Sequence, residues 1–172
     1  IVEQKDSAPL VKQRIIDKLH LKNTFYGGKI NAEDNQARSY VKTEGNWKVT
    51  PETDMSVPMG AGGLVSTTED LNIFYYNLFE GDLISKASLE AMKTTKEGTG
   101  MGLIKLDFND FEVFGHGGGI DGFSSISVHF PEEKLTASYI SNASDYPLNS
   151  IFIEAMKITL GLPYQIPDFA PP

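Results

Sequence analysis

The residues best suited to chemistry are His116 and the glycines that follow it, Gly117–Gly119. Glycines let a backbone approach a ligand and leave its N–H groups uncovered, and a histidine can donate, accept or titrate near neutral pH. Consecutive glycines in a strand lose conformational entropy without contributing packing. The segment therefore predicts a substrate-facing strand that helps to form an oxyanion hole, with His116 polarising or anchoring the substrate. The alternative is a glycine-rich hairpin corner with an incidental histidine.

Two other patterns match motifs of nucleophilic catalysis. Ser39-Tyr40-Val41-Lys42 fits SxxK, in which the lysine accepts the serine proton. That chemistry needs both side chains within hydrogen-bond reach on one face of a buried helix, whereas these residues lie in a polar stretch without an apolar helical stripe. Tyr75-Tyr76-Asn77 fits Tyr-x-Asn, but Tyr75 falls on the buried stripe of an amphipathic helix. We expect both matches to be fortuitous, with Tyr75 in the core.

The glycine segment also matches the oxyanion loop of lipases with the α/β-hydrolase fold. That fold requires a downstream GxSxG nucleophile turn, and residues 122–126 fail at the last position of this pattern. The surrounding antiparallel pattern is also wrong for a mostly parallel sheet, so we reject this alternative.

Composition excludes several other classes of function. The chain has 172 residues and a formal net charge of -8, which argues against a nucleic-acid partner because phosphate neutralisation needs clustered Lys and Arg. No apolar run reaches the length of a membrane span. There are no cysteines, and His20, His116 and His129 lack the spacing of metal ligands. We expect no metal and no cofactor.

The periodicity predicts an α+β fold with helices first, an antiparallel meander next and one helix last. We expect three parts: a helical region at 1–98, the sheet strands with the last helix at 99–161, and a Pro-rich tail at 162–172. A first helix is expected from an N-cap at Ser7 to His20, followed by a polar connection over 22–59. Further expected elements are a helix capped within 66–69 and bearing Leu71, Phe74, Tyr75, Leu78 and Phe79, a short helix capped by Ser85, strands near 101–106, from 112, at 123–130 and at 135–142, and a helix from Pro147.

Three segments in chain order carry a family resemblance: 19–24, 60–67 and 115–125. With Ser141-Asn142, they resemble the serine β-lactamase and penicillin-binding-protein-like hydrolases, in the branch of class C β-lactamases, DD-peptidases and related esterases. The similarity runs from about Leu10 to Leu160, and its most specific piece is His-Gly-Gly with Gly-Phe-Ser-Ser behind it. The implied fold is the C-terminal portion of the β-lactamase/transpeptidase-like fold.

The family carries its catalytic motifs in the order SxxK, Tyr-x-Asn, and Lys-Thr-Gly or a His variant of it. His116-Gly117-Gly118 resembles the last of these. The resemblance implies that His116 and the N–H of Gly119 are catalytic, that Gly117 and Gly118 bind substrate, and that a nucleophilic serine supplies the other oxyanion donor. It also implies that the earlier motifs precede Ile1, because complete family domains are about twice this length.

Two departures from the family pattern shape the expected activity. His116 stands in place of Lys, and Gly117 in place of a Thr whose hydroxyl helps to hold a substrate carboxylate. The resemblance therefore favours a peptidase or esterase over a β-lactamase. We expect the C-terminal part of an acyl-transfer hydrolase for an amide, ester or β-lactam, inactive alone. The alternative is a non-catalytic, degenerate binding module of the same fold.

Partners follow from the same reasoning. The resemblance implies a small-molecule or peptide substrate and an extracytoplasmic location. The apolar surface of the sheet and helices would then be covered by the N-terminal segment or by a second copy of the chain.

Overall fold

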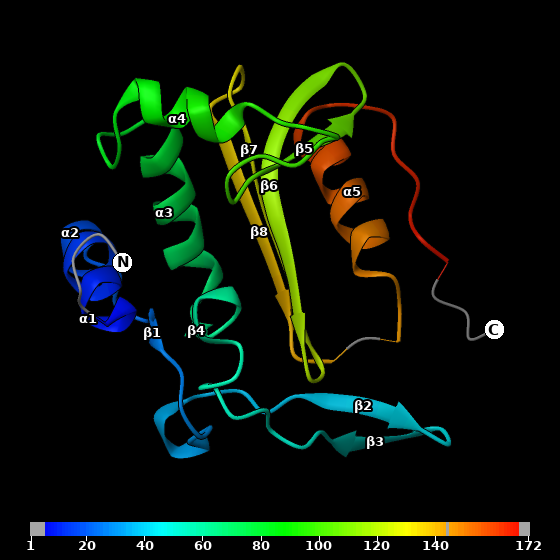
Figure 1. Cartoon of the computed structure of the whole chain (residues 1–172). Coiled ribbons are helices and arrows are strands. Elements are labelled where there is room, and N and C mark those ends of the chain that lie inside the picture. Colours follow the sequence, from blue (N-terminus) through cyan, green and yellow to red (C-terminus); the bar gives the residue numbers. More distant parts are fainter. Residues whose placement is uncertain (1–5, 144, 169–172) are drawn as a thin grey trace.

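The computed structural model describes residues 6–143 and 145–168. Its centre is an antiparallel sheet of four strands in the order β5-β6-β7-β8. Helix α5 (Leu148–Thr159) covers one face, and helices α3 (Thr68–Phe79) and α4 (Lys86–Lys93) lie on the other (Figure 1). The strands are β5 (Ile104–Phe108), β6 (Phe111–Ile120), β7 (Phe123–Phe130) and β8 (Leu135–Ser141). This architecture confirms the expected α+β fold.

The face of the sheet under α5 carries the larger core. Val113 of β6 and both Val128 and Phe130 of β7 are buried there against Phe152 and Met156 of α5. Side chains alternate between the two faces of a strand, so Ile126 shares this face with Val128 and Phe130. The alternation expected for 123–130 is confirmed.

The opposite face packs against α3. Tyr75 and Leu78 are buried there with Leu103, which confirms the expected apolar stripe. The Thr67 side chain caps the start of α3 by accepting a hydrogen bond from the Asp70 N–H, and Ser85 caps α4 through the Ser88 N–H, as expected. These caps satisfy N–H groups that have no partner within a helix.

The first helical segment differs from expectation at its start and in its middle. Helix α1 (Ser7–Val11) has Asp6 as its N-cap, so the assignment of Ser7 as the cap is wrong. Proline tolerates several positions of a first helical turn, so Pro9 does not single out the cap residue. A π-helical turn (Lys12–Ile16) then separates α1 from α2 (Asp17–Leu19).

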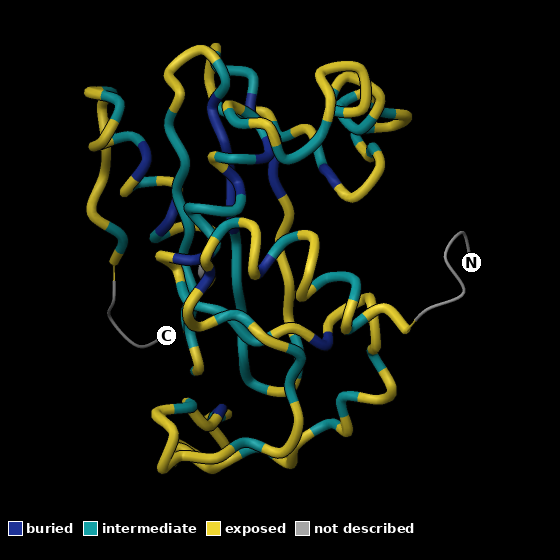
Figure 2. The backbone as a smooth tube through the Cα atoms, turned by 90° about the vertical axis from the view of Figure 1, so that its left-hand side faces the viewer, coloured by how far each residue is buried: buried dark blue, intermediate teal, exposed yellow. Residues whose placement is uncertain are grey.

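The stretch 22–59 is not a plain connection. Strand β1 (Phe25–Tyr26) pairs with β4 (Leu64–Val65), and β2 (Tyr40–Thr43) pairs with β3 (Asn46–Val49) in a hairpin. Two 3₁₀ turns lie at Ala32–Asp34 and Met59–Ala61. Residues 41–49 are all exposed, and Figure 2 shows this end of the molecule largely in the colour of exposed residues. A hairpin exposed on both faces has no contrast between a buried face and a solvent face to mark it, which explains the missed strands.

No helix within 6–143 and 145–168 has the length and apolar character that crossing a bilayer requires. Residues 1–5 of the expected helical region and 169–172 of the expected tail lie outside the described residues.

Candidate functional site

The predicted glycine segment forms the far end of β6. His116, Gly117, Gly118 and Gly119 are all exposed, and they pair with Ser127, Ile126, Ser125 and Ser124 of β7. On the other side, β5 accompanies β6 only as far as the pair Ile104–Gly115. From His116 onward, that edge of β6 therefore has no strand beside it among the described residues.

The backbone groups of Gly117 and Gly119 point toward this open edge. Ile120 and Phe123 close the β6–β7 hairpin around a two-residue turn, which makes them a hydrogen-bonded pair. Hydrogen-bonded and non-bonded pairs alternate along an antiparallel ladder. The N–H and C=O groups of Gly117 and Gly119 are consequently directed away from β7. A ligand at the open edge would meet N–H donors that the sheet does not use.

The fold itself does not require glycine at these two positions. A Cβ added to Gly117 would lie 3.5 Å from its nearest neighbour, and one on Gly119 3.7 Å, both ordinary contacts. Neither residue has a positive φ. By contrast, a Cβ on Gly115 would lie 2.2 Å from the Ser127 carbonyl oxygen, so packing does explain that glycine. The unfilled space beside Gly117 and Gly119 is available to a ligand.

The imidazole of His116 bends along the same edge. Its Nδ1 lies 2.6 Å from the carbonyl oxygen of Gly117. A carbonyl can only accept, so Nδ1 carries the proton and donates. In the neutral ring, Nε2 is then the acceptor. An exposed imidazole with this tautomer can accept a hydrogen bond from a substrate or a catalytic hydroxyl.

Tyr75 is a buried residue of α3 that contacts the main chain of β6, and its position does not suit a catalytic role. It is 7% exposed and belongs to the α3 core. Burial raises the pKa of its hydroxyl to about 12, although a hydrogen bond with the main chain of His116 lowers it somewhat. Tyr75 is therefore a neutral phenol near pH 7. The expectation that it belongs to the core is confirmed.

Ser39 and Lys42 do not form a nucleophile–base pair. Lys42 lies in strand β2, and Ser39 directly precedes that strand. Because side chains alternate between the two faces of a strand, residues three apart point to opposite sides. The buried Ser39 hydroxyl bonds to Thr50, and the Lys42 ammonium lies 2.7 Å from the Asp145 carboxylate. The SxxK pattern here lacks the helix that its chemistry requires.

A small open hollow adjoins the glycine segment. Its volume is about 300 Å³, and its lining comes from β6, β7 and the start of α5: Gly117, Gly118, Ser124, Ser125, Pro147 and Asn149. The hollow is bordered by backbone and short polar side chains, which suits a small polar ligand group. Within 6–143 and 145–168, no three His, Asp or Glu side chains gather to hold a metal ion.

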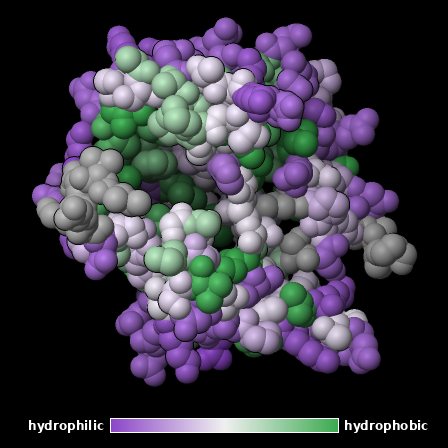
Figure 3. Space-filling view, viewed as in Figure 1, coloured by the Kyte–Doolittle hydropathy of each residue, from purple (hydrophilic) through white to green (hydrophobic). Residues whose placement is uncertain are grey.

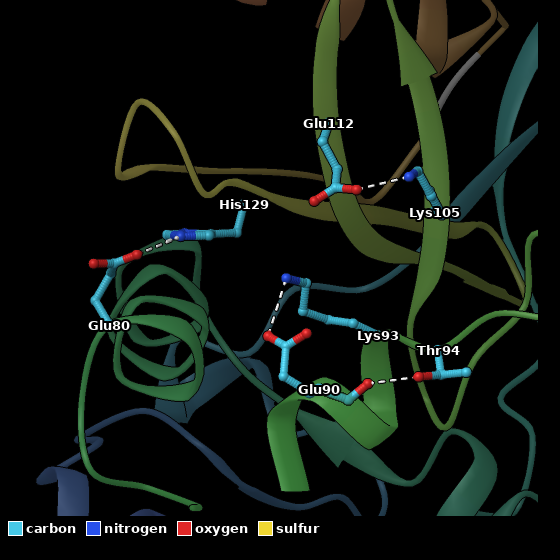
Figure 4. A network of polar contacts seen from close by, with 7 residues as sticks. All are labelled: Glu80, Glu90, Lys93, Thr94, Lys105, Glu112 and His129. Carbon is cyan, nitrogen blue, oxygen red and sulfur yellow. Dashed lines mark hydrogen bonds and ion pairs between the residues drawn. The ribbon is translucent and has the colours of Figure 1, made fainter. Parts of the chain in front are cut away.

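His129 lies on the same face as Ser125 and Ser127, as its register predicts, but helix α3 covers it completely. The imidazole is 0% exposed and stacks on Phe79 with ring centroids 4.4 Å apart. Its Nδ1 bonds to the Thr136 hydroxyl at 2.8 Å. Its Nε2 lies 3.3 Å from a carboxylate oxygen of Glu80 (Figure 4). Burial lowers the pKa of His129, and the Glu80 carboxylate opposes that shift. His129 is a structural residue.

No role was expected for Asp121, which lies two residues beyond Gly119. Its carboxylate accepts two hydrogen bonds from Thr53, one from the N–H and one from the hydroxyl. An Asp-Gly pair between strands does indicate a hairpin turn. The partner, however, lies far away in the chain.

Comparison with known proteins places this geometry in a family context. The family model described as beta-lactamase matches residues 2–151. Penicillin-binding protein 4* of Bacillus subtilis (strain 168) is 29% identical over an alignment of 121 residues, and the match covers 63% of this chain and 26% of that protein. The D-stereospecific amidohydrolase of Streptomyces sp. superposes with a TM-score of 0.66 at 28% identity, over 79% of this chain and 44% of that one.

A further solved structure shows the likeness of fold. The D-amino acid amidase of Ochrobactrum anthropi SV3 superposes with a TM-score of 0.79 at 23% identity, over 93% of this chain and 55% of that one. The chain thus spans about a quarter of the curated relative and about half of these solved structures.

Proposed function

Because this chain belongs to the beta-lactamase family, we propose that it supplies the oxyanion strand of a serine hydrolase. The reaction is acyl transfer through an acyl-enzyme, on an amide, an ester or a β-lactam. The observation that carries the proposal is the open edge of β6, where Gly117 and Gly119 direct backbone groups away from β7 and leave space that the fold does not need.

In this mechanism the N–H of Gly119 donates to the oxygen that becomes negatively charged in the tetrahedral intermediate. A fixed backbone donor stabilises this charge more than it stabilises the neutral substrate carbonyl, so it lowers the barrier. The Nε2 of His116 accepts a hydrogen bond from the substrate or from the attacking hydroxyl. Gly117 and Gly118 line the adjoining hollow and let the substrate approach the main chain.

Gly117 also bears on the choice of substrate. A residue without a hydroxyl offers no side-chain donor to a substrate carboxylate at this position. A neutral amide or ester suits the site better than a substrate that carries a carboxylate there. The similarity to the D-stereospecific amidohydrolase of Streptomyces sp. supports an amide.

The nucleophilic serine and its lysine belong, in this proposal, to a segment outside residues 1–172. Ser39 and Lys42 lack the required geometry, and the relatives are longer than this chain. Apolar side chains exposed around β1 and β4 would contact that segment or a second copy of the chain: Phe25, Val57, Met59 and Leu64. Figure 3 shows apolar side chains exposed in the middle of one face, between more hydrophilic ends.

Activity-based labelling tests the proposal. The 172-residue chain and the product of the complete gene would each be treated with a fluorescent penicillin and with a fluorophosphonate, and any labelled peptide would be mapped by mass spectrometry. We expect the complete product to be labelled on a serine outside 1–172, and the chain alone to remain unlabelled. Stoichiometric labelling of Ser39, or of any other serine in the chain, would contradict the proposal. A complete product that no probe labels would favour a non-catalytic binding module.

A further inference from the structure

The turn that follows Gly119 is held from outside the sheet. Asp121 occupies the first turn position with a φ of 54°. Its Oδ2 accepts a hydrogen bond from the Thr53 N–H at 3.0 Å, and its Oδ1 accepts one from the Thr53 hydroxyl at 2.6 Å. A carboxylate bound by two donors of one residue fixes orientation as well as distance.

Gly122, the second residue of the turn, packs against the main chain of Tyr40, which lies in the same segment of the chain as Thr53. A Cβ on Gly122 would lie 2.6 Å from the carbonyl oxygen of Tyr40, so the turn and the Tyr40 main chain are in close contact. The Tyr40 N–H donates to the Asn142 carbonyl at 2.9 Å, and the Asn142 amide donates to the Arg38 carbonyl at 2.8 Å. The segment 38–53 is thus fastened both to the β6–β7 turn and to the end of β8.

This support matters because the strand it holds is otherwise weakly constrained. Beyond Gly115, β6 is paired only with β7, and its next residues include three glycines with no side chains to pack. An oxyanion donor must stay in place while charge develops, and a displacement of about 1 Å can reduce a rate by about 10²-fold.

We propose that Asp121 is a positioning residue, which holds the Gly119 N–H in place by clamping the β6–β7 turn to Thr53. This inference rests on the proposed function of Gly119. Asp121 lies two residues beyond Gly119 and touches no reacting atom in this scheme. Its effect passes through the turn to the strand.

Matched substitutions separate this role from general stability. Asp121→Asn keeps the size of the side chain and the tolerance for positive φ, but an amide oxygen cannot accept both Thr53 hydrogen bonds in the present geometry. Thr53→Val removes the hydroxyl and keeps the N–H, whereas Thr53→Ser keeps both donors. Asp110→Asn makes the same change in the exposed turn between β5 and β6 at the other end of the sheet.

The product of the complete gene would be assayed with p-nitrophenyl acetate and with D-phenylalaninamide. We expect Asp121→Asn to lower kcat about 10- to 100-fold, with KM changed by less than about threefold, because the donor acts on the transition state. Thr53→Val lowers kcat less, and Thr53→Ser and Asp110→Asn leave it unchanged. Amide hydrogen exchange should become faster within 117–123 at the amides that pair with β7, those of Gly118 and Ile120, and stay unchanged in 104–115.

The results distinguish failure of the Asp121 clamp from failure of the proposed hydrolase function. Unchanged kcat and unchanged exchange in Asp121→Asn would overturn the clamp, as would an equal loss of kcat in Asp110→Asn. If the wild-type protein hydrolyses neither compound and is labelled by neither a penicillin nor a fluorophosphonate, the proposed function fails, and the exchange measurement still decides whether Asp121 holds the strand. Faster exchange at 117–123 in that case supports the clamp as a structural device without a catalytic readout.

Discussion

Glycine-to-alanine substitutions along β6 distinguish a strand shaped by packing from one shaped by a ligand. In Gly119→Ala the new Cβ would lie 3.7 Å from its nearest neighbour, and in Gly117→Ala 3.5 Å, so neither change creates a clash. Alanine is favoured over glycine within a strand by about 0.5–1 kcal/mol. We expect both variants to be as stable as the wild type or slightly more stable.

Gly115→Ala is the matched control on the same strand. Its Cβ would lie 2.2 Å from the Ser127 carbonyl oxygen, and backbone would have to move to admit it. Overpacking of this kind lowers the free energy of unfolding by about 1–3 kcal/mol. Both variants gain the same intrinsic preference for alanine, so the free energies of unfolding of Gly119→Ala and Gly115→Ala should differ by about 1–3 kcal/mol, the cost of overpacking.

Two assays complete this comparison. Urea unfolding followed by circular dichroism measures the free energy of unfolding of each variant. Hydrolysis of p-nitrophenyl acetate by the product of the complete gene measures kcat, which we expect Gly119→Ala to lower about 100-fold, because a methyl group displaces the oxyanion from its donor. A Gly119→Ala protein of wild-type stability and wild-type kcat would refute the claim that the substrate occupies the space beside Gly119, because alanine keeps the backbone N–H.

The remaining predictions concern residues away from the open edge. Burial lowers the pKa of His129 below 6.5 in the folded protein, so the unfolded state binds the proton first as the pH falls. The contribution of neutral His129 to the free energy of unfolding is therefore fully present above about pH 6.5 and decreases below it. A ¹H NMR titration measures the pKa of His129, and urea unfolding as a function of pH measures the loss of stability. In His129→Gln the free energy of unfolding should depend less on pH. Asp70 is buried and accepts hydrogen bonds from the Asn23 N–H at 2.7 Å and the Thr24 hydroxyl at 2.8 Å, so Asp70→Ala should lower the free energy of unfolding by about 1–3 kcal/mol in a urea titration. Ser39→Ala should leave probe labelling of the complete product unchanged, and loss of label would identify Ser39 as the nucleophile.

Elements with strong local signals were predictable from the sequence. The alternation of Ile126, Val128 and Phe130 identifies one face of β7, because a strand with one face in the core must place apolar residues at every second position. Ser85 identifies the start of α4, because its hydroxyl satisfies a helical N–H that would otherwise lack a partner. Such signals depend only on residues close together in the chain.

The features of the fold and the site that the sequence did not predict depend on contacts between residues far apart in the chain. The hairpin β2–β3 is exposed on both faces, so no burial pattern marks it. Asp121 and Thr53 are 68 residues apart, and nothing in either local sequence specifies the other. The burial of His129 likewise follows from the position of α3 over the sheet, which the alternation of β7 alone does not reveal.

The central claim is that the N–H of Gly119 donates to the oxyanion. The most direct measurement is a crystal structure of the complete gene product with a boronic acid bound as a tetrahedral adduct of its nucleophilic serine. We expect one boronate oxygen at about 2.7–3.1 Å from the Gly119 nitrogen, the distance typical of an oxyanion donor. An adduct whose oxygens are held by other donors, with the Gly119 nitrogen beyond hydrogen-bond reach, would contradict it.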